Sequence, residues 1–150
     1  MATKRTSVCV LTSRGMAAVS SIALAGDGAR GILATVFRTG NSATPSPFRG
    51  TSPSQAESDT VMHGVIVDGG RTIDEVVIGC EAKNTFLIHC HGNPLLVERI
   101  VKLLQSHGAV LTDAESFTER QLRSCSKTVI ETEAKLAMQK SATRLGVKIL

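Results

Sequence analysis

The chain has few aromatic residues: they make up 3% of its 150 residues and include no tyrosine and no tryptophan. Proteins that bind single-stranded nucleic acid stack the bases on aromatic side chains, so the sequence argues against that class of function. The core must be built from valine, isoleucine, leucine and alanine. The length suits one domain that buries roughly two-thirds of the surface of its unfolded chain.

Long hydrophobic runs and paired cysteines are also missing. No stretch reaches the ~20 apolar residues of a membrane span, and the apolar run near the N-terminus is too short for a secretory signal. The four cysteines are far apart in the sequence and are Cys9, Cys80, Cys90 and Cys125. We expect a cytoplasmic protein without membrane association, whose thiols are reduced and mostly buried.

A motif for nucleotide hydrolysis is missing as well. The sequence has no G-x-x-x-x-G-K-[ST] loop, the motif that cradles the phosphates of a bound nucleotide. Its net charge of +4 assists an encounter with an anion without requiring one. We therefore predict no catalytic residue and no activity for this chain alone.

Hydrophobic periodicity and turn residues predict both strands and helices. The predicted strands are Ser7–Leu11, Val19–Leu24, Val61–Val67, Ile73–Ile78, Thr85–Cys90 and Ala109–Leu111. The predicted helices are Ala29–Phe37, Pro94–Ser106, Thr112–Leu122 and Thr128–Leu145. Asp68-Gly69-Gly70-Arg71 reads as a hairpin turn. This order predicts an α+β fold, with a mixed, mostly antiparallel sheet and helices packed on one face.

Capping residues support the predicted helix boundaries. Asn93 can cap the helix that Pro94 begins, because proline suits the first helical position. Gly108 can end that helix in a left-handed conformation. Thr112 and Glu115 match a capping box that would open the next helix.

Two segments stand apart from the packed elements. Residues 38–60 are rich in proline, serine and threonine, so we predict a flexible surface loop, either a plain tether or a lid over a site. We assign residues 1–126 to an α/β domain and residues 127–150 to a C-terminal helix. The apolar stripe of that helix is thin, which suggests a surface for a partner.

His89-Cys90-His91 has the composition of a metal site. Alternation along a strand places the two histidines on one face and the cysteine on the other, so only two ligands converge. A structural zinc needs four ligands and a catalytic zinc usually three. The residues that could complete the set are Cys80, His63 and His107. We predict no metal site, and histidines whose ring nitrogens bond to backbone groups.

The turn His91-Gly92-Asn93-Pro94 opens the helix predicted at 94–106. Free amides at a helix N-terminus attract anions, and glycine permits close approach of a ligand to the backbone. The turn is therefore a candidate anion site. Nothing in the sequence places Cys9, Cys80 or Cys125 near a histidine, so we interpret the cysteines as buried and inert rather than nucleophilic.

Three segments carry a family resemblance: His91-Gly92-Asn93-Pro94, Phe117-Thr118-Glu119-Arg120 and Glu131-Thr132-Glu133-Ala134. Together they resemble motifs of the N-terminal domain of the TrmE (MnmE) tRNA-modification GTPases. The likeness spans most of the chain and is most specific between residues 73 and 134. The helical and GTPase domains that follow in that family have no counterpart in these 150 residues. We expect either an excised piece or a stand-alone relative.

The resemblance implies an α/β dimerisation module that binds a formyl-tetrahydrofolate, the one-carbon donor in wobble-uridine modification. The ligand-binding arginine and glutamate of the family fall at Ala23 and Leu87, and its ligand loop is shortened to Lys83-Asn84. Its lysine falls near Ser126, one residue before Lys127. Loss of two charge-assisted hydrogen bonds, each worth roughly 1.5–3 kcal/mol, would weaken folate binding about a hundredfold or more.

The leading hypothesis is a non-catalytic module that forms a homodimer or binds a partner protein, with an indirect link to tRNA. The alternative is a tetrahydrofolate-binding module that serves wobble-uridine modification through a site of substituted residues. The predicted cofactor-binding residues are His91, Gly92, Asn93, Arg120 and Lys127.

Overall fold

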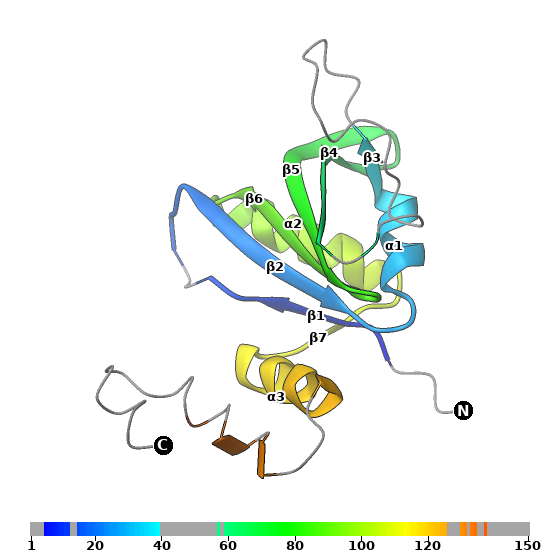
Figure 1. The fold of residues 1–150 in the computed structure, drawn as a ribbon. Coiled ribbons are helices and arrows are strands. Elements are labelled where there is room, and N and C mark those ends of the chain that lie inside the picture. Colours follow the sequence, from blue (N-terminus) through cyan, green and yellow to red (C-terminus); the bar gives the residue numbers. More distant parts are fainter. Residues whose placement is uncertain are drawn as a thin grey trace. The chain divides into compact units, whose positions relative to one another are not determined.

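The computed structural model describes residues 5–12, 15–39, 57, 59–125, 130–131, 133–134 and 137 (Figure 1). The strands are β1 (Ser7–Val10), β2 (Val19–Ala25), β3 (Phe37–Thr39), β4 (Thr60–Asp68), β5 (Arg71–Ala82), β6 (Thr85–His91) and β7 (Val110–Leu111). The helices are α1 (Ala29–Val36), α2 (Pro94–Ser106) and α3 (Ala114–Cys125). The chain divides into two compact units, Met1–Thr112 and Asp113–Leu150. The first unit holds the sheet with α1 and α2, and the second holds α3.

The first unit is built on a seven-stranded sheet with the order β3-β4-β5-β6-β2-β1-β7. Within the described residues, β1 and β7 pair in parallel and every other neighbouring pair is antiparallel. The predicted hairpin joins β4 to β5 through Gly69 and Gly70, which both have positive φ angles. The predicted α+β fold with a mixed, mostly antiparallel sheet is therefore confirmed.

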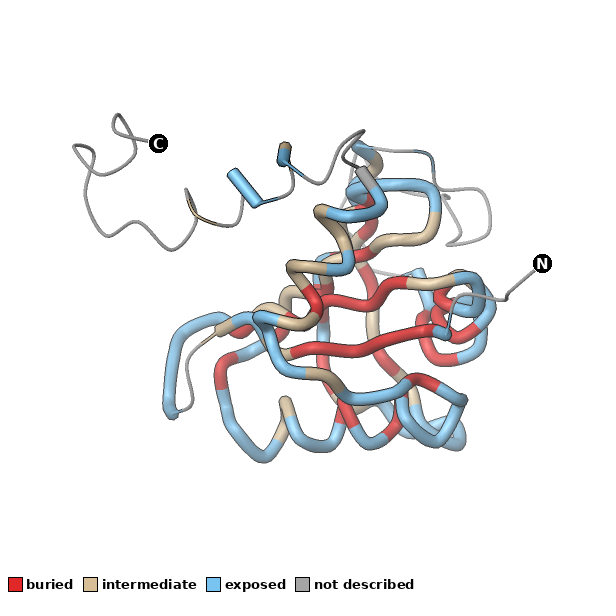
Figure 2. The backbone as a smooth tube through the Cα atoms, turned by 90° about the horizontal axis from the view of Figure 1, so that it is seen from below, coloured by how far each residue is buried: buried red, intermediate tan, exposed pale blue. Residues whose placement is uncertain are grey.

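One hydrophobic core lies between the sheet and the helices α1 and α2. Alternate strand residues supply it, and Ile22, Phe86 and Ile88 are fully buried there. Leu33 of α1 and Leu104 of α2 meet the same set of strand residues and are also fully buried. Figure 2 shows how buried residues gather along the central strands. Both helices thus pack on one face of the sheet, as the sequence predicts.

The opposite face of the sheet carries the other alternate residues, which strand register arranges in rows. The first, which we call the apolar row, crosses β4, β5, β6 and β2 at Val61, Gly79, Leu87 and Ala23. The next, the histidine row, crosses the same strands at His63, Val77, His89 and Ser21. The two rows differ in character, because the first has no polar side chain and the second has three polar side chains and one valine.

The caps of α2 form as predicted. The Asn93 side-chain oxygen accepts a hydrogen bond from the Leu95 N–H at 2.9 Å, and Pro94 occupies the first helical position. Gly108 follows the helix with a φ of 101°, a conformation that glycine adopts without strain. Because β6 ends at His91, only Gly92 and Asn93 separate the strand from the helix.

Two predictions about element boundaries are wrong. Phe37 is not the last residue of α1 but the first of β3, which pairs with β4. This strand forms because Gly64 has no side chain, so that the Phe37 ring and the Arg38 carbonyl lie directly against it. Thr112 does not cap α3: its hydroxyl is buried and, within the described residues, has no hydrogen-bond partner.

Asp113 is the residue that caps α3. Its carboxylate accepts hydrogen bonds from the Ser116 N–H at 2.8 Å and from the Ser116 hydroxyl at 2.7 Å. The bond from the Ser116 N–H is the main cause that holds the pKa of the Asp113 carboxyl below its usual value. A carboxylate at this position also suits the positive end of the helix dipole.

Other predictions fall partly on residues outside the described ranges. The loop predicted at 38–60 is described only at its ends, and most of the helix predicted at 128–145 lies outside as well. Cys9, Cys80 and Cys90 are buried and form no disulfide, which confirms the prediction of buried thiols for these three.

None of the described helices is both long and apolar enough to cross a membrane.

Candidate functional site

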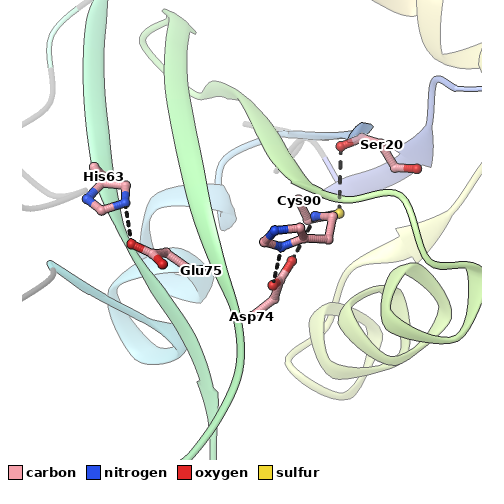
Figure 3. Close-up of polar contacts among 6 residues, drawn as sticks. Ser20, His63, Asp74, Glu75 and Cys90 are labelled. Carbon is pink, nitrogen blue, oxygen red and sulfur yellow. Dashed lines mark hydrogen bonds and ion pairs between the residues drawn. The ribbon is translucent and has the colours of Figure 1, made fainter. Parts of the chain in front are cut away.

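The turn between β6 and α2 is held by a carboxylate from β5. Asp74 is 8% exposed and accepts two hydrogen bonds from one residue. The His91 backbone N–H donates to Asp74 Oδ2 at 2.9 Å, and His91 Nδ1 lies 2.7 Å from Asp74 Oδ1. Figure 3 shows Asp74 making these contacts beside β6. A buried carboxylate is costly unless hydrogen bonds compensate it, and His91 supplies that compensation.

This contact fixes how the His91 imidazole presents itself. A carboxylate only accepts hydrogen bonds, so Nδ1 must carry the ring proton that reaches Asp74. In the neutral ring, Nε2 then keeps its lone pair. The His91 side chain is 68% exposed, so the rest of the ring faces solvent. His91 is thereby an oriented hydrogen-bond acceptor.

Gly92 is needed for packing within the chain. Its N–H donates to the Ala18 carbonyl at 3.2 Å, and its carbonyl accepts from the Ala17 N–H at 3.0 Å. A Cβ atom on Gly92 would overlap the Ala17 carbonyl. The sequence suggested that Gly92 lets a ligand come close to the backbone. In the structure, the segment before β2 takes that position against Gly92 instead.

The start of α2 offers few amides to an anion. Pro94 has no N–H, the Leu95 N–H donates to the Asn93 side chain, and the Val97 N–H donates to the Asn93 carbonyl. The assignment of His91, Gly92 and Asn93 to a cofactor site remains a prediction. In this turn, the side chain of His91 is held in place by its hydrogen bond to the buried Asp74 carboxylate.

Ala23 and Leu87, the positions of the family's arginine and glutamate, are direct neighbours across β2 and β6. Ala23 is fully buried and Leu87 is half-buried. The sequence comparison thus points to two positions that the fold places side by side in the apolar row. Opposite charges at such a pair would meet, whereas alanine and leucine offer only alkyl groups.

The remaining predicted site residues belong to the second unit or lie outside the described ranges. Arg120 is exposed on α3, where its Nε donates to the Ser116 carbonyl at 3.2 Å. Lys127 lies outside the described residues. The structure therefore brings together His91, Gly92 and Asn93.

A shallow depression of about 180 Å³ lies over β5 and β6 on the face that carries the two rows. Val19 and Val77 contribute apolar surface to it, and His63, Glu75, His89 and His91 contribute polar groups. His63 Nε2 lies 2.7 Å from Glu75 Oε1 (Figure 3), and His89 Nδ1 lies 2.9 Å from the Ser21 hydroxyl. Sequence reasoning missed Glu75, which lines the depression, and Asp74, which holds His91.

The histidines are satisfied differently from the prediction. We predicted backbone partners for His89 and His91, but the partners are the side chains of Ser21 and Asp74. The register of β2 with β6 brings Ser21 opposite His89, which local sequence does not reveal. Among the residues that the structure describes, no three His, Cys, Asp or Glu side chains gather in a way that could hold a metal ion.

Cys90 lies on the core side of β6, between the two histidines. Its Sγ is 3.6 Å from the Ser20 carbonyl (Figure 3). Burial, with a smaller contribution from the negative charge of Asp74, raises the pKa of the Cys90 thiol to about 11. The thiolate is the reactive form of cysteine, so this thiol is a poor nucleophile at neutral pH.

The sequence was expected to contain no dinucleotide-binding fingerprint, and that expectation is wrong, because a glycine pattern from the end of β2 into α1 matches it. Residues 26–31 read Gly-Asp-Gly-Ala-Arg-Gly, which fits G-x-G-x-x-G. However, a side chain on Gly26 would meet the Thr6 backbone, and the Gly28 N–H donates to Thr6 Oγ1 at 2.9 Å. Thr6 therefore occupies the space that such glycines leave for a pyrophosphate. The neighbours of β2 are antiparallel, unlike those of a dinucleotide-binding unit.

The site therefore lies on an α+β domain whose sheet carries one apolar and one histidine row on the face opposite α1 and α2. Bacterial proteins named tRNA modification GTPase MnmE are similar to this chain. The protein of Lacticaseibacillus paracasei is 29% identical over 153 residues, which cover 96% of this chain and 31% of the relative. That of Geobacillus kaustophilus is 32% identical over 124 residues, covering 77% of this chain and 25% of the relative. No protein-family model matches the chain.

A third relative, from Desulfotalea psychrophila, is 28% identical over 156 residues, covering 99% of this chain and 31% of its own length. These similarities confirm the resemblance to the N-terminal domain of the TrmE (MnmE) tRNA-modification GTPases. The chain spans less than a third of the length of these relatives.

Replacement of Asp74 by alanine is expected to lower the free energy of unfolding by about 1–3 kcal/mol, because two His91 donors lose their buried acceptor. The matched control is Glu75→Ala, which removes the neighbouring but exposed carboxylate and should cost less than about 1 kcal/mol. Urea unfolding followed by circular dichroism measures both. Equal losses for the two variants would contradict the role given to Asp74.

Replacement of Gly92 by alanine is expected to destabilise the protein by about 1–3 kcal/mol, because the new methyl group displaces the Ala17 carbonyl. Gly31→Ala is the control, since Gly31 is exposed on α1 with no heavy atom within 4 Å of an added Cβ. That change should stabilise the protein by about 0.5–1 kcal/mol. Thermal unfolding of both variants checks the prediction, and a neutral Gly92→Ala would refute it.

Proposed function

We propose that this chain is a non-catalytic dimerisation module of a tRNA-modification system. The relatives support the tRNA-modification context, since each is named a tRNA modification GTPase. The absence of a P-loop motif from these 150 residues supports a role without nucleotide hydrolysis by this segment itself. The family resemblance supports self-association, because resemblance to the N-terminal domain of that family implies a dimerisation module.

The observation that carries the proposal is the apolar row on the outer sheet face. Its four positions, on four successive strands, contain no polar side chain. Beside it, Val77 is 39% exposed although it lies in the middle of β5. Apolar surface that gathers on one sheet face is typical of an interaction site. Two copies related by a two-fold axis could bury the same patch against itself.

A partner other than a second copy would use the same surface. The choice of a second copy follows from the self-complementary character of an apolar row, which pairs with another apolar row without unpaired charges. A charged partner would find few counter-charges in the row itself. The histidine row beside it would lie at the rim of such an interface, where polar groups tolerate partial hydration.

The dimer is tested by Val61→Asp, which places a charge in the apolar row at a residue that is 36% exposed. We expect its dissociation constant for self-association to rise at least about tenfold, or ~1.4 kcal/mol, because the carboxylate must be desolvated. Leu95→Asp is the control, because Leu95 is 74% exposed on α2, away from this sheet face. Sedimentation equilibrium measures both variants. A wild-type chain that stays monomeric at millimolar concentration contradicts the proposal.

Folate binding is the second function to be tested, because the resemblance implies it. The alkyl pair at Ala23 and Leu87 supports a site that has lost its charge-assisted hydrogen bonds. We expect formyl-tetrahydrofolate at about 1 mM, roughly a thousand times a micromolar Kd, to cause no thermal shift. A saturable shift that Asn93→Ala or Arg120→Ala abolishes would instead establish the folate-binding alternative.

A further inference from the structure

The depression over β5 and β6 is lined by apolar surface and by the polar side chains of one glutamate and three histidines. Of the nine residues around it, all in the described part of the chain, none is a lysine or an arginine. Glu75 contributes a carboxylate, and three histidines contribute imidazole rings. This composition contrasts with the net charge of +4 of the whole chain. A cationic, donor-rich group is the ligand class that complements such a surface.

Each acceptor is held in place by a contact that leaves another atom available. Asp74 holds His91 through Nδ1, which leaves Nε2 on the exposed side of the ring. His63 Nε2 contacts one oxygen of Glu75, and a carboxylate has a second oxygen that can accept. Glu75 keeps 60% of its side-chain surface exposed in that pair. Side chains that are already held in place lose less conformational entropy when a ligand binds than mobile side chains do.

The size of the depression restricts the ligand further. Its volume of about 180 Å³ is below the ~300 Å³ at which pockets for drug-sized molecules begin. Val19 and Val77 give it an apolar part on which a flat group can rest. A small planar cation with several N–H donors satisfies both the size and the chemistry.

We propose that this depression binds an amidinium or guanidinium group, with its N–H donors directed to Glu75 and to His91 Nε2. The plane of the group rests against Val77. The guanidinium could come from a free small molecule or from an arginine side chain of another protein molecule. The chemistry is the same in both cases. The site is separate from the folate positions at Ala23 and Leu87, which lie in the apolar row.

The test is an NMR titration of the full chain with benzamidine, N-acetylarginine amide, benzamide and benzoate. Benzamide is a neutral analogue of benzamidine, and benzoate is an anionic one. We expect benzamidine or N-acetylarginine amide to shift the His91 and His89 ring signals in a saturable way. His107, at the far end of α2, should not respond. Saturation by N-acetylarginine amide alone indicates a protein-borne arginine, and saturation by benzamidine alone indicates a free ligand.

The variant Glu75→Gln removes the charge and keeps the shape of the side chain. We expect it to weaken binding of the responding cation at least about tenfold, whereas Glu98→Gln on α2 leaves binding unchanged. The proposal is overturned if neither cation shifts the His91 signals, if benzamide or benzoate binds as tightly as the cations, or if Glu75→Gln binds like the wild type. The ligand series decides the outcome even if the variant is unstable.

Discussion

The contact between Asp74 and His91 is the interaction on which the candidate site depends. One buried carboxylate ties β5 to the end of β6 through both the backbone N–H and the ring of His91. Immediately afterwards, Gly92 locks the turn to the segment before β2. Three strands and the start of α2 are therefore joined within two residues. A histidine on a free loop would lose side-chain entropy on binding, but this one is already oriented.

The outer face of the sheet carries two rows of residues, which lie two positions apart along each strand. One row is apolar, and the next row carries histidines. A row without charged side chains favours contact with another apolar surface. The second row keeps polar groups that are hydrogen-bonded in pairs. A single face thus combines an apolar row with a small depression that is lined in part by a glutamate and three histidines.

Local sequence was sufficient wherever neighbours in the chain decide the structure. Asn93 and Pro94 begin α2, and the two glycines turn the β4–β5 hairpin, because each effect acts over a few residues. Contacts between distant residues were not predictable in this way. Asp74 is seventeen positions before His91, and β3 forms because Gly64, far along the chain, leaves room for Phe37. The cap of α3 is an exception among the local contacts, because the capping-box pattern pointed to Thr112 whereas Asp113, three residues before Ser116, accepts the hydrogen bond.

Native-state hydrogen exchange of the His91 amide tests most directly whether this junction is rigid. That N–H donates to a buried carboxylate, so it should exchange only when most of the first unit unfolds, alongside the amides of Ile22 and Ile88 in the core. Asp74→Asn retains a weaker acceptor and should reduce the protection without abolishing it. If the His91 amide exchanges as fast as those of Gly69 and Gly70 at the hairpin tip, the junction is not locked and the account of an oriented histidine is wrong.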